Sequence, residues 1–232
     1  MEHGWREKFG IRWAPLRVGS NAIPLPEWVI HRDLAAGRHN CESIPGFKGR
    51  AYHFMRFLDH FFSDPRGLFY MQWNPNAVRI VENFFKHKML SVMGAASASK
   101  SYTLAPLAVG MFLLDPQKTK VLVTSTTVQT AKGKIWGDIC YAWDQVCQVY
   151  KEMGAAPPGK KMTGDPIIRY EMDGIISHKA GLELVPTQQS SEKQSMEKIQ
   201  GYKNENVIFI GDEWDTLGHG LINTVNGNLR AN

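Results

Sequence analysis

The sequence predicts an α/β fold in which a mostly parallel central sheet is flanked by helices. Two observations carry this prediction. From about residue 75 onwards, strand-like and helix-like segments alternate along the chain, which is the order that places parallel strands side by side. The strand-like runs Val121–Ser125 and Val207–Ile210 are also apolar almost throughout, as strands are when both faces of their sheet are buried.

The first elements of this alternation have clear signals. Pro75–Lys86 is expected to be a helix, because Asn74 is a good N-cap and proline favours the first helical position. The apolar run Lys88–Met93 is expected to be a short strand. Lys100–Leu114 is expected to be an apolar helix that ends at Asp115-Pro116, since proline cannot continue it.

The second half continues the pattern. A long helix is expected from Val128 to about Lys151, with an aromatic set that fits the core face of a helix: Trp136, Tyr141 and Trp143. Short strands are expected at 167–172, 174–178 and 182–186, where Asp173-Gly174 is a hairpin signal. The polar run Gln188–Gln200 is expected to be a loop or weak helix, and a further helix is expected from Leu221.

Residues 1–66 differ from the rest of the chain. They carry several prolines, scattered tryptophans and histidines, and most of the arginines. Helical patterning appears there only in patches such as Ala51–Phe62. We therefore expect an irregular, partly helical N-terminal extension over residues 1–66, followed by one core domain over residues 67–232.

Composition sets broad limits on function. The 232 residues are 43% apolar and 21% charged, which suffices for a sizeable core. The net charge of +5 permits a polyanionic partner, but a basic enzyme surface explains it equally well. Three cysteines without a C-x-x-C pair predict neither a disulfide framework nor a zinc site. Without a signal peptide or a run of about 18 apolar residues, the prediction is a soluble, intracellular protein.

One motif combines a loop of very small residues with Lys100-Ser101 at a predicted helix start. Such a loop lets backbone N–H groups approach phosphate oxygens, and the helix dipole adds positive charge. Lys100 would contact the β- and γ-phosphates, and Ser101 would bind Mg²⁺. The spacing matches a P-loop except that serine replaces the second glycine; an ordinary turn before a helix is the alternative. The candidate phosphate-binding loop is Gly94, Ala95, Ala96, Ser97, Ala98 and Ser99.

A second motif is the apolar run Val207–Ile210, which leads through glycine into Asp212 and Glu213. Carboxylates at the end of a parallel strand lie where ligands bind in open α/β sheets. Asp212 would hold Mg²⁺, and Glu213 would orient and deprotonate the attacking water. The alternative is that both acids cap the next helix. Together, the two motifs predict a P-loop NTPase of the ASCE/RecA-like kind that uses ATP and Mg²⁺.

Four segments, in family order, resemble the ATPase domain of the large terminase subunit of tailed bacteriophages. They are the serine-variant P-loop through Tyr102, the strand Val121–Ser125 with the Ser/Thr-rich run after it, the hairpin stretch Ile176–Pro186, and Lys198-Ile-Gln-Gly201-Tyr ahead of the acidic strand. The resemblance covers about residues 70 to 220. Tyr102 belongs by this resemblance to the nucleotide-binding segment.

The resemblance implies ATP hydrolysis that powers translocation of double-stranded DNA into a procapsid. It also implies a homo-oligomeric ring, a portal protein and a small terminase subunit as partners, and the cytoplasm of an infected bacterium as location. Family members add a coupling-motif strand and a C-terminal nuclease domain. The chain ends about twenty residues after Glu213, so we expect a fragment that lacks both.

Two further roles follow from the resemblance. Motors of this type need a positive side chain against the transition-state charge. Arg169 is the candidate, because it is the one arginine between the P-loop and Asp212; a solvent-exposed arginine at the sheet edge is the alternative. Related ATPases also place an amide ahead of the P-loop, which makes Gln72 and Asn76 candidates for adenine binding. Phe69, Tyr70 and Trp73 offer aromatic surface nearby, although core packing explains them as well.

Two other functions compete with this prediction. One is a helicase-like or other P-loop NTPase acting on nucleic acid. The other is a nucleotide-binding assembly module that does not hydrolyse. Lys160-Lys161 and the Lys132, Lys134 pair are candidates for contact with DNA phosphates, against the alternative of a solvated basic face.

Overall fold

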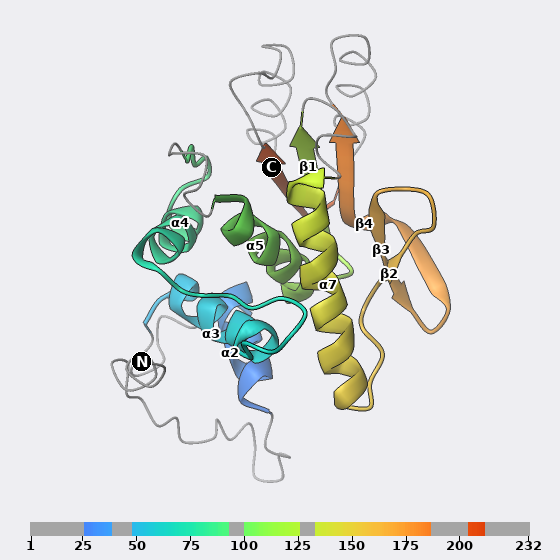
Figure 1. Cartoon of the computed structure of the whole chain (residues 1–232), viewed down its shortest axis with the longest axis horizontal. Coiled ribbons are helices and arrows are strands. Elements are labelled where there is room, and N and C mark those ends of the chain that lie inside the picture. Colours follow the sequence, from blue (N-terminus) through green and yellow to red (C-terminus); the bar gives the residue numbers. More distant parts are fainter. Residues whose placement is uncertain (1–25, 39–47, 93–99, 126–132, 187–203, 212–232) are drawn as a thin grey trace.

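The computed structural model describes residues 26–38, 48–92, 100–125, 133–186 and 204–211. Five strands in these residues form one mixed sheet with the order β2-β3-β4-β1-β5 (Figure 1). The strands β4 (Ile175–Pro186), β1 (Thr119–Ser125) and β5 (Asn206–Gly211) are parallel, with β1 in the middle. The outer strands β3 (Ile167–Met172) and β2 (Lys160–Lys161) add to β4 as an antiparallel ribbon. The fold is therefore mixed α/β, and the predicted apolar strands at 121–125 and 207–210 are confirmed within its parallel part.

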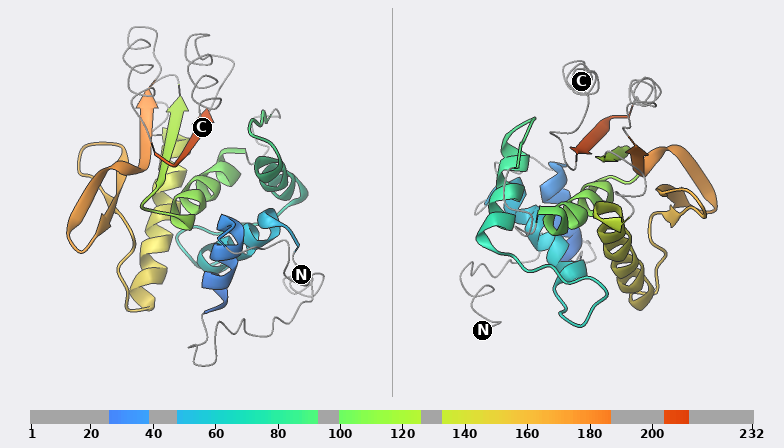
Figure 2. Two further views of the ribbon diagram at one scale, coloured as in Figure 1. Left: turned by 180° about the vertical axis from the view of Figure 1, so that it is seen from behind. Right: turned by 45° about the horizontal axis from the view of Figure 1, so that its top comes forward.

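Five described helices accompany the sheet: α2 (Glu27–Ala36), α3 (Arg50–Phe62), α4 (Pro75–Lys86), α5 (Lys100–Leu114) and α7 (Ile135–Glu152). Helices α5 and α7 lie against one face of the sheet, and α2, α3 and α4 lie beyond them (Figure 2). The bounds of α4 and α5 are those the sequence predicts. Asn74 caps α4 as expected, because its side-chain oxygen accepts the N–H groups of Asn76 at 3.0 Å and Ala77 at 2.9 Å.

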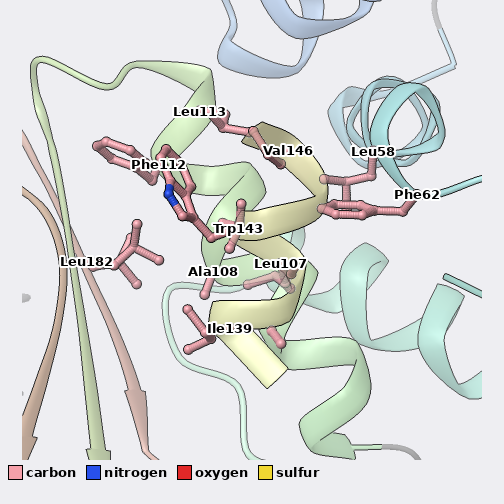
Figure 3. Packing of buried hydrophobic residues seen from close by; sticks show 14 of the residues in the cluster. Leu58, Phe62, Leu107, Ala108, Phe112, Leu113, Ile139, Trp143, Val146 and Leu182 are labelled. Carbon is pink, nitrogen blue, oxygen red and sulfur yellow. The ribbon is translucent and has the colours of Figure 1, made fainter. Parts of the chain in front are cut away.

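The hydrophobic core lies between this face of the sheet and the helices (Figure 3). At its centre, the Trp143 ring of α7 lies 5.8 Å from the Phe112 ring of α5. Buried residues of α3, including Phe54 and Phe61, belong to the same cluster. Residues 1–66 were expected to precede or wrap the core domain. Their described part instead contributes side chains to the core itself.

The prediction of a strand at Lys88–Met93 is wrong for its described residues, 88–92. Residues 88–92 form no strand, and the side chains of Met89 and Leu90 are 59% and 38% exposed. A strand needs a hydrogen-bonded neighbour, and no described strand lies beside this run. Its apolar composition alone therefore did not make it part of the sheet. Met93 lies outside the described residues.

The hairpin is confirmed at its turn but differs in its second strand. Asp173 and Gly174 both have positive φ, at 52° and 79°, as a two-residue hairpin turn requires. The two short strands expected at 174–178 and 182–186 are one strand, β4, with an irregular register between Arg169 and Glu171 of its partner β3. Glycine is required at Gly181, because a Cβ atom there would lie 2.1 Å from the Ile168 carbonyl oxygen.

The second face of the sheet is also buried at β1 and β4. It carries Leu122, Thr124 and Val185, each at most 1% exposed. It also carries a charged pair: Lys120 Nζ of β1 lies 2.6 Å from Glu183 Oε2 of β4. The register places Glu183 opposite Leu122, so the two charged side chains lie diagonally across the parallel pair.

Helices α2 and α3 are joined through a buried histidine pair. His31 Nδ1 and His53 Nδ1 lie 2.8 Å apart, and the rings stack at 5.1 Å. One of these nitrogens must donate and the other must accept, so a single proton lies between the two Nδ1 atoms. Burial lowers the pKa of both imidazoles, that of His53 to about 4, with the His31 charge as the second cause. Glu27, 3.4 Å from His31 Nε2, partly offsets this effect at His31.

This pair predicts a loss of stability in mild acid. A histidine with a lowered folded-state pKa binds fewer protons than the unfolded chain, so its contribution is complete above pH about 6.5 and falls as the pH drops towards 4. For His53 the loss amounts to about 3 kcal/mol at its full extent. Urea unfolding at a series of pH values measures it.

A His53→Gln variant should flatten this part of the pH profile, because glutamine does not titrate. The matched control is His87→Gln, which removes an exposed histidine and should leave the profile unchanged. Equal slopes for His53→Gln and the wild type would show that the pair is not the source of the acid sensitivity.

Candidate nucleotide site

The three parallel strands end together at one edge of the sheet. Ser125 of β1 is in register with Pro186 of β4, and Thr124 is in register with Gly211, the last residue of β5. The arrowheads of these strands point the same way in Figure 1. The carboxyl ends of parallel strands are where α/β sheets bind ligands. Asp212 and Glu213 follow Gly211 directly in the chain and lie outside the described residues.

Helix α5 begins at Lys100, the residue predicted to open the P-loop helix. Ser101 and Tyr102 lie in its first turn and are half-buried, and the helix packs against β1 and β4. A helix N-terminus presents free N–H groups and a positive dipole end. Lys100 adds a full positive charge, so this first turn suits an anionic group. The loop residues from Gly94 to Ser99 lie outside the described residues.

The segment before α4 packs onto the first turn of α5. The rings of Phe69 and Tyr102 stack at 4.8 Å with an angle of 18° between their planes. Phe69 is 5% exposed and therefore fills the core rather than offering a surface for a base. This contact packs the segment before α4 against Tyr102. The expected adenine-binding segment therefore lies next to the first turn of α5.

The amide candidates Gln72 and Asn76 are both exposed. Their aromatic neighbour Trp73 has a structural role, since its Nε1–H donates to Asp59 Oδ1 at 2.7 Å. Asn76 lies in the first turn of α4, where its backbone N–H is capped by Asn74. The structure therefore leaves both amide side chains accessible on the surface, three and seven residues after Phe69, the aromatic residue that packs on Tyr102.

One carboxylate near Tyr102 was missed by the sequence reasoning. Asp138 is in the first turn of α7, which begins beside the tip of β1 (Figure 1). Burial raises the pKa of Asp138, and the pKa of Tyr102 is raised first by burial and then by the charges of Tyr70 and Asp138. An aspartate in a first helical turn is ordinary in any sequence, so no local signal marks it.

Arg169 does not lie with these residues. It belongs to β3, in register with Gly181 of β4, which in turn is in register with Lys120 of β1. Lys120 precedes the end of β1 at Ser125 by five residues, or about 17 Å of strand. Arg169 is half-buried, and its Nη1 contacts His178 Nδ1. The structure thus places it away from the strand ends.

Among the residues that the structure describes, no group of three or more His, Cys, Asp or Glu side chains could hold a metal ion. Of the expected magnesium ligands, Ser101 is described and Asp212 is not. None of the described helices combines the length and the apolar character needed to cross a membrane. Comparison with protein-family models, with curated proteins and with solved structures found no match.

Proposed function

We propose that this chain is the ATP-hydrolysing part of a motor that moves double-stranded DNA, of the kind found in the large terminase subunits of tailed phages. One observation carries the proposal. The strand β5 runs up to Gly211, directly before Asp212-Glu213, and it lies parallel to β1 as the outermost strand on that side of the described sheet. The helix that starts with Lys100-Ser101 packs against the parallel strands β1 and β4. The sequence order and strand directions are therefore those that a phosphate site at a strand edge needs.

The roles of the residues follow from their chemistry. The Lys100 ammonium and the N–H groups of the first turn of α5 would neutralise phosphate charge. The Ser101 hydroxyl and the Asp212 carboxylate are oxygen donors, which fit Mg²⁺. When bound, Mg²⁺ supplies charge stabilisation for the transferred phosphoryl group. Glu213 would orient the attacking water and accept its proton.

The test is a phosphate-release assay with and without linear duplex DNA. DNA should stimulate hydrolysis by the wild type, and Glu213→Ala should lower the rate at least about 100-fold, because it removes the general base. Binding of ATP should persist in that variant. Glu152→Ala is the matched control, since Glu152 is exposed at the end of α7, and it should hydrolyse like the wild type. Equal rates for the wild type and Glu213→Ala in the presence of DNA would refute the proposal.

A second candidate function is a nucleotide-binding assembly module without turnover. The observation that favours it is the exposed, irregular run at 88–92, because a P-loop ordinarily follows a strand of the sheet. Such a module should bind ATP through Lys100 and show no release of phosphate in any variant. A helicase-like enzyme would instead separate DNA strands, which a terminase-type motor is not expected to do.

A further inference from the structure

The outer ribbon of the sheet brings three basic side chains together. Lys160 of β2 is directly opposite Arg169 of β3 in the antiparallel register. Arg169 Nη1 contacts His178 Nδ1, on the irregular stretch of β4. Cross-strand partners have Cβ atoms only about 5 Å apart, and like charges placed opposite one another destabilise a sheet. The arrangement therefore needs negative charge nearby.

The described residues supply little of that charge. The Arg169 guanidinium has no carboxylate partner in the part of the chain that the structure describes, and its buried Nε has no hydrogen-bond partner there. Glu171 Oε2 lies 4.0 Å from Lys160 Nζ, at the outer limit of an ion pair. Among the described residues, Lys160 thus has one carboxylate at the limit of ion pairing and Arg169 has none, while the neighbouring Lys161 is paired with Asp144 at 2.7 Å.

The cluster presents hydrogen-bond donors and no free acceptor. Arginine only donates, so His178 Nδ1 must accept from Arg169 and the ring proton must be on Nε2. His178 and Lys160 are exposed. The cluster therefore presents donors from Lys160 Nζ, from the His178 Nε2–H group and from the remaining Arg169 N–H groups. A group with several acceptor oxygens and a negative charge matches this set, and phosphate is the common one.

This cluster is separate from the candidate nucleotide site. Strand β3 lies three positions away from β5 in the strand order, towards the opposite edge of the sheet (Figure 1). Three strand spacings are about 14 Å, and the row of Arg169 is a further 17 Å or so from the strand ends. A phosphate held here would therefore not belong to a nucleotide at the end of β5.

We propose that Lys160, Arg169 and His178 form a phosphate-binding site on the outer ribbon, and that its ligand is the backbone of duplex DNA. The choice of DNA as the source of the phosphate rests on the proposed function, whereas the site itself rests on the geometry of the ribbon. Free inorganic phosphate shares the chemistry and is the other source.

The test uses the 232-residue chain and measures its affinity for a labelled DNA duplex over a series of salt concentrations. A Lys160→Gln/Arg169→Gln variant should bind every duplex more weakly, and the slope of log K against log salt should fall by about 1 for each cation removed. Lys160→Gln/His178→Gln changes only exposed residues, so it gives the same test if Arg169→Gln does not fold. Lys151→Gln is the matched control, an exposed lysine on α7, and should keep the wild-type slope.

A second arm compares thermal unfolding in phosphate and in chloride at equal ionic strength. A reduced DNA slope identifies the DNA backbone as the ligand. An unchanged slope, with a phosphate-specific stabilisation that the variants lose, identifies free phosphate. If both variants match Lys151→Gln in both arms, the site is refuted. Failure of the proposed function is distinguishable, since it appears as unstimulated hydrolysis whatever the DNA slope.

Discussion

A Lys120→Met variant is expected to lose about 3–5 kcal/mol of unfolding free energy, because it removes a positive charge that lies next to the buried carboxylate of Glu183. The two side chains are 2% and 6% exposed, and Nζ lies 2.6 Å from Oε2. Removing a charge from water costs several kcal/mol, and a partner charge at this distance offsets a large part of that cost inside a sheet. Urea unfolding of the variant and the wild type gives the difference directly.

The chain contains a matched control for this experiment. Lys118 precedes β1 and lies 2.8 Å from Glu205 Oε2, yet these side chains are 49% and 66% exposed. Lys118→Met should therefore change stability by no more than about 1 kcal/mol. The double variant Lys120→Met/Glu183→Leu should regain most of the loss, since it replaces both buried charges with apolar side chains of similar size. Equal losses for Lys118→Met and Lys120→Met would contradict the argument.

This buried pair shows what sequence reasoning reaches and what it does not. The apolar runs that became β1 and β5 were predictable, because a continuous apolar run of that length fits a strand buried on both faces. The sequence predicted this strand only from Val121 onwards, one residue after Lys120, and a lysine normally lies at the solvent-exposed end of a strand. Its partner Glu183 is 63 residues away in the chain, and no local pattern links the two.

The same limit applies to the candidate site. Lys100 was placed in a helix from the motif, and it is the first described residue of α5. The packing of Phe69 on Tyr102 and the nearness of Asp138 depend on how α5, α7 and the segment before α4 pack together, which the sequence does not encode locally. The prediction of a strand at 88–92 failed because it relied on local composition alone. That composition suits a strand, but strand formation also depends on a neighbouring strand elsewhere in the fold.

A Trp143→Ala variant is expected to lose about 3–5 kcal/mol, the range for removing a large aromatic side chain from a packed core. Trp143 is 1% exposed and packs against Phe112 (Figure 3). Its ring also packs closely on Gly159, in the segment between α7 and β2: a Cβ atom added at Gly159 would lie 3.1 Å from the ring. The alanine variant therefore leaves a cavity between α5, α7 and that connection, which the rigid elements around it cannot fill.

Tyr141 provides the control on the same helix. The sequence suggested that Trp136, Tyr141 and Trp143 share the core face, but Tyr141 is 61% exposed while the two tryptophans are buried. The reason is the helical repeat of about 100° per residue: a spacing of seven returns to the same face, whereas a spacing of five turns about 140° away from it. Tyr141→Ala should thus change the unfolding free energy by at most about 0.5 kcal/mol. A loss for Tyr141→Ala as large as that for Trp143→Ala would mean that α7 is rotated relative to the core.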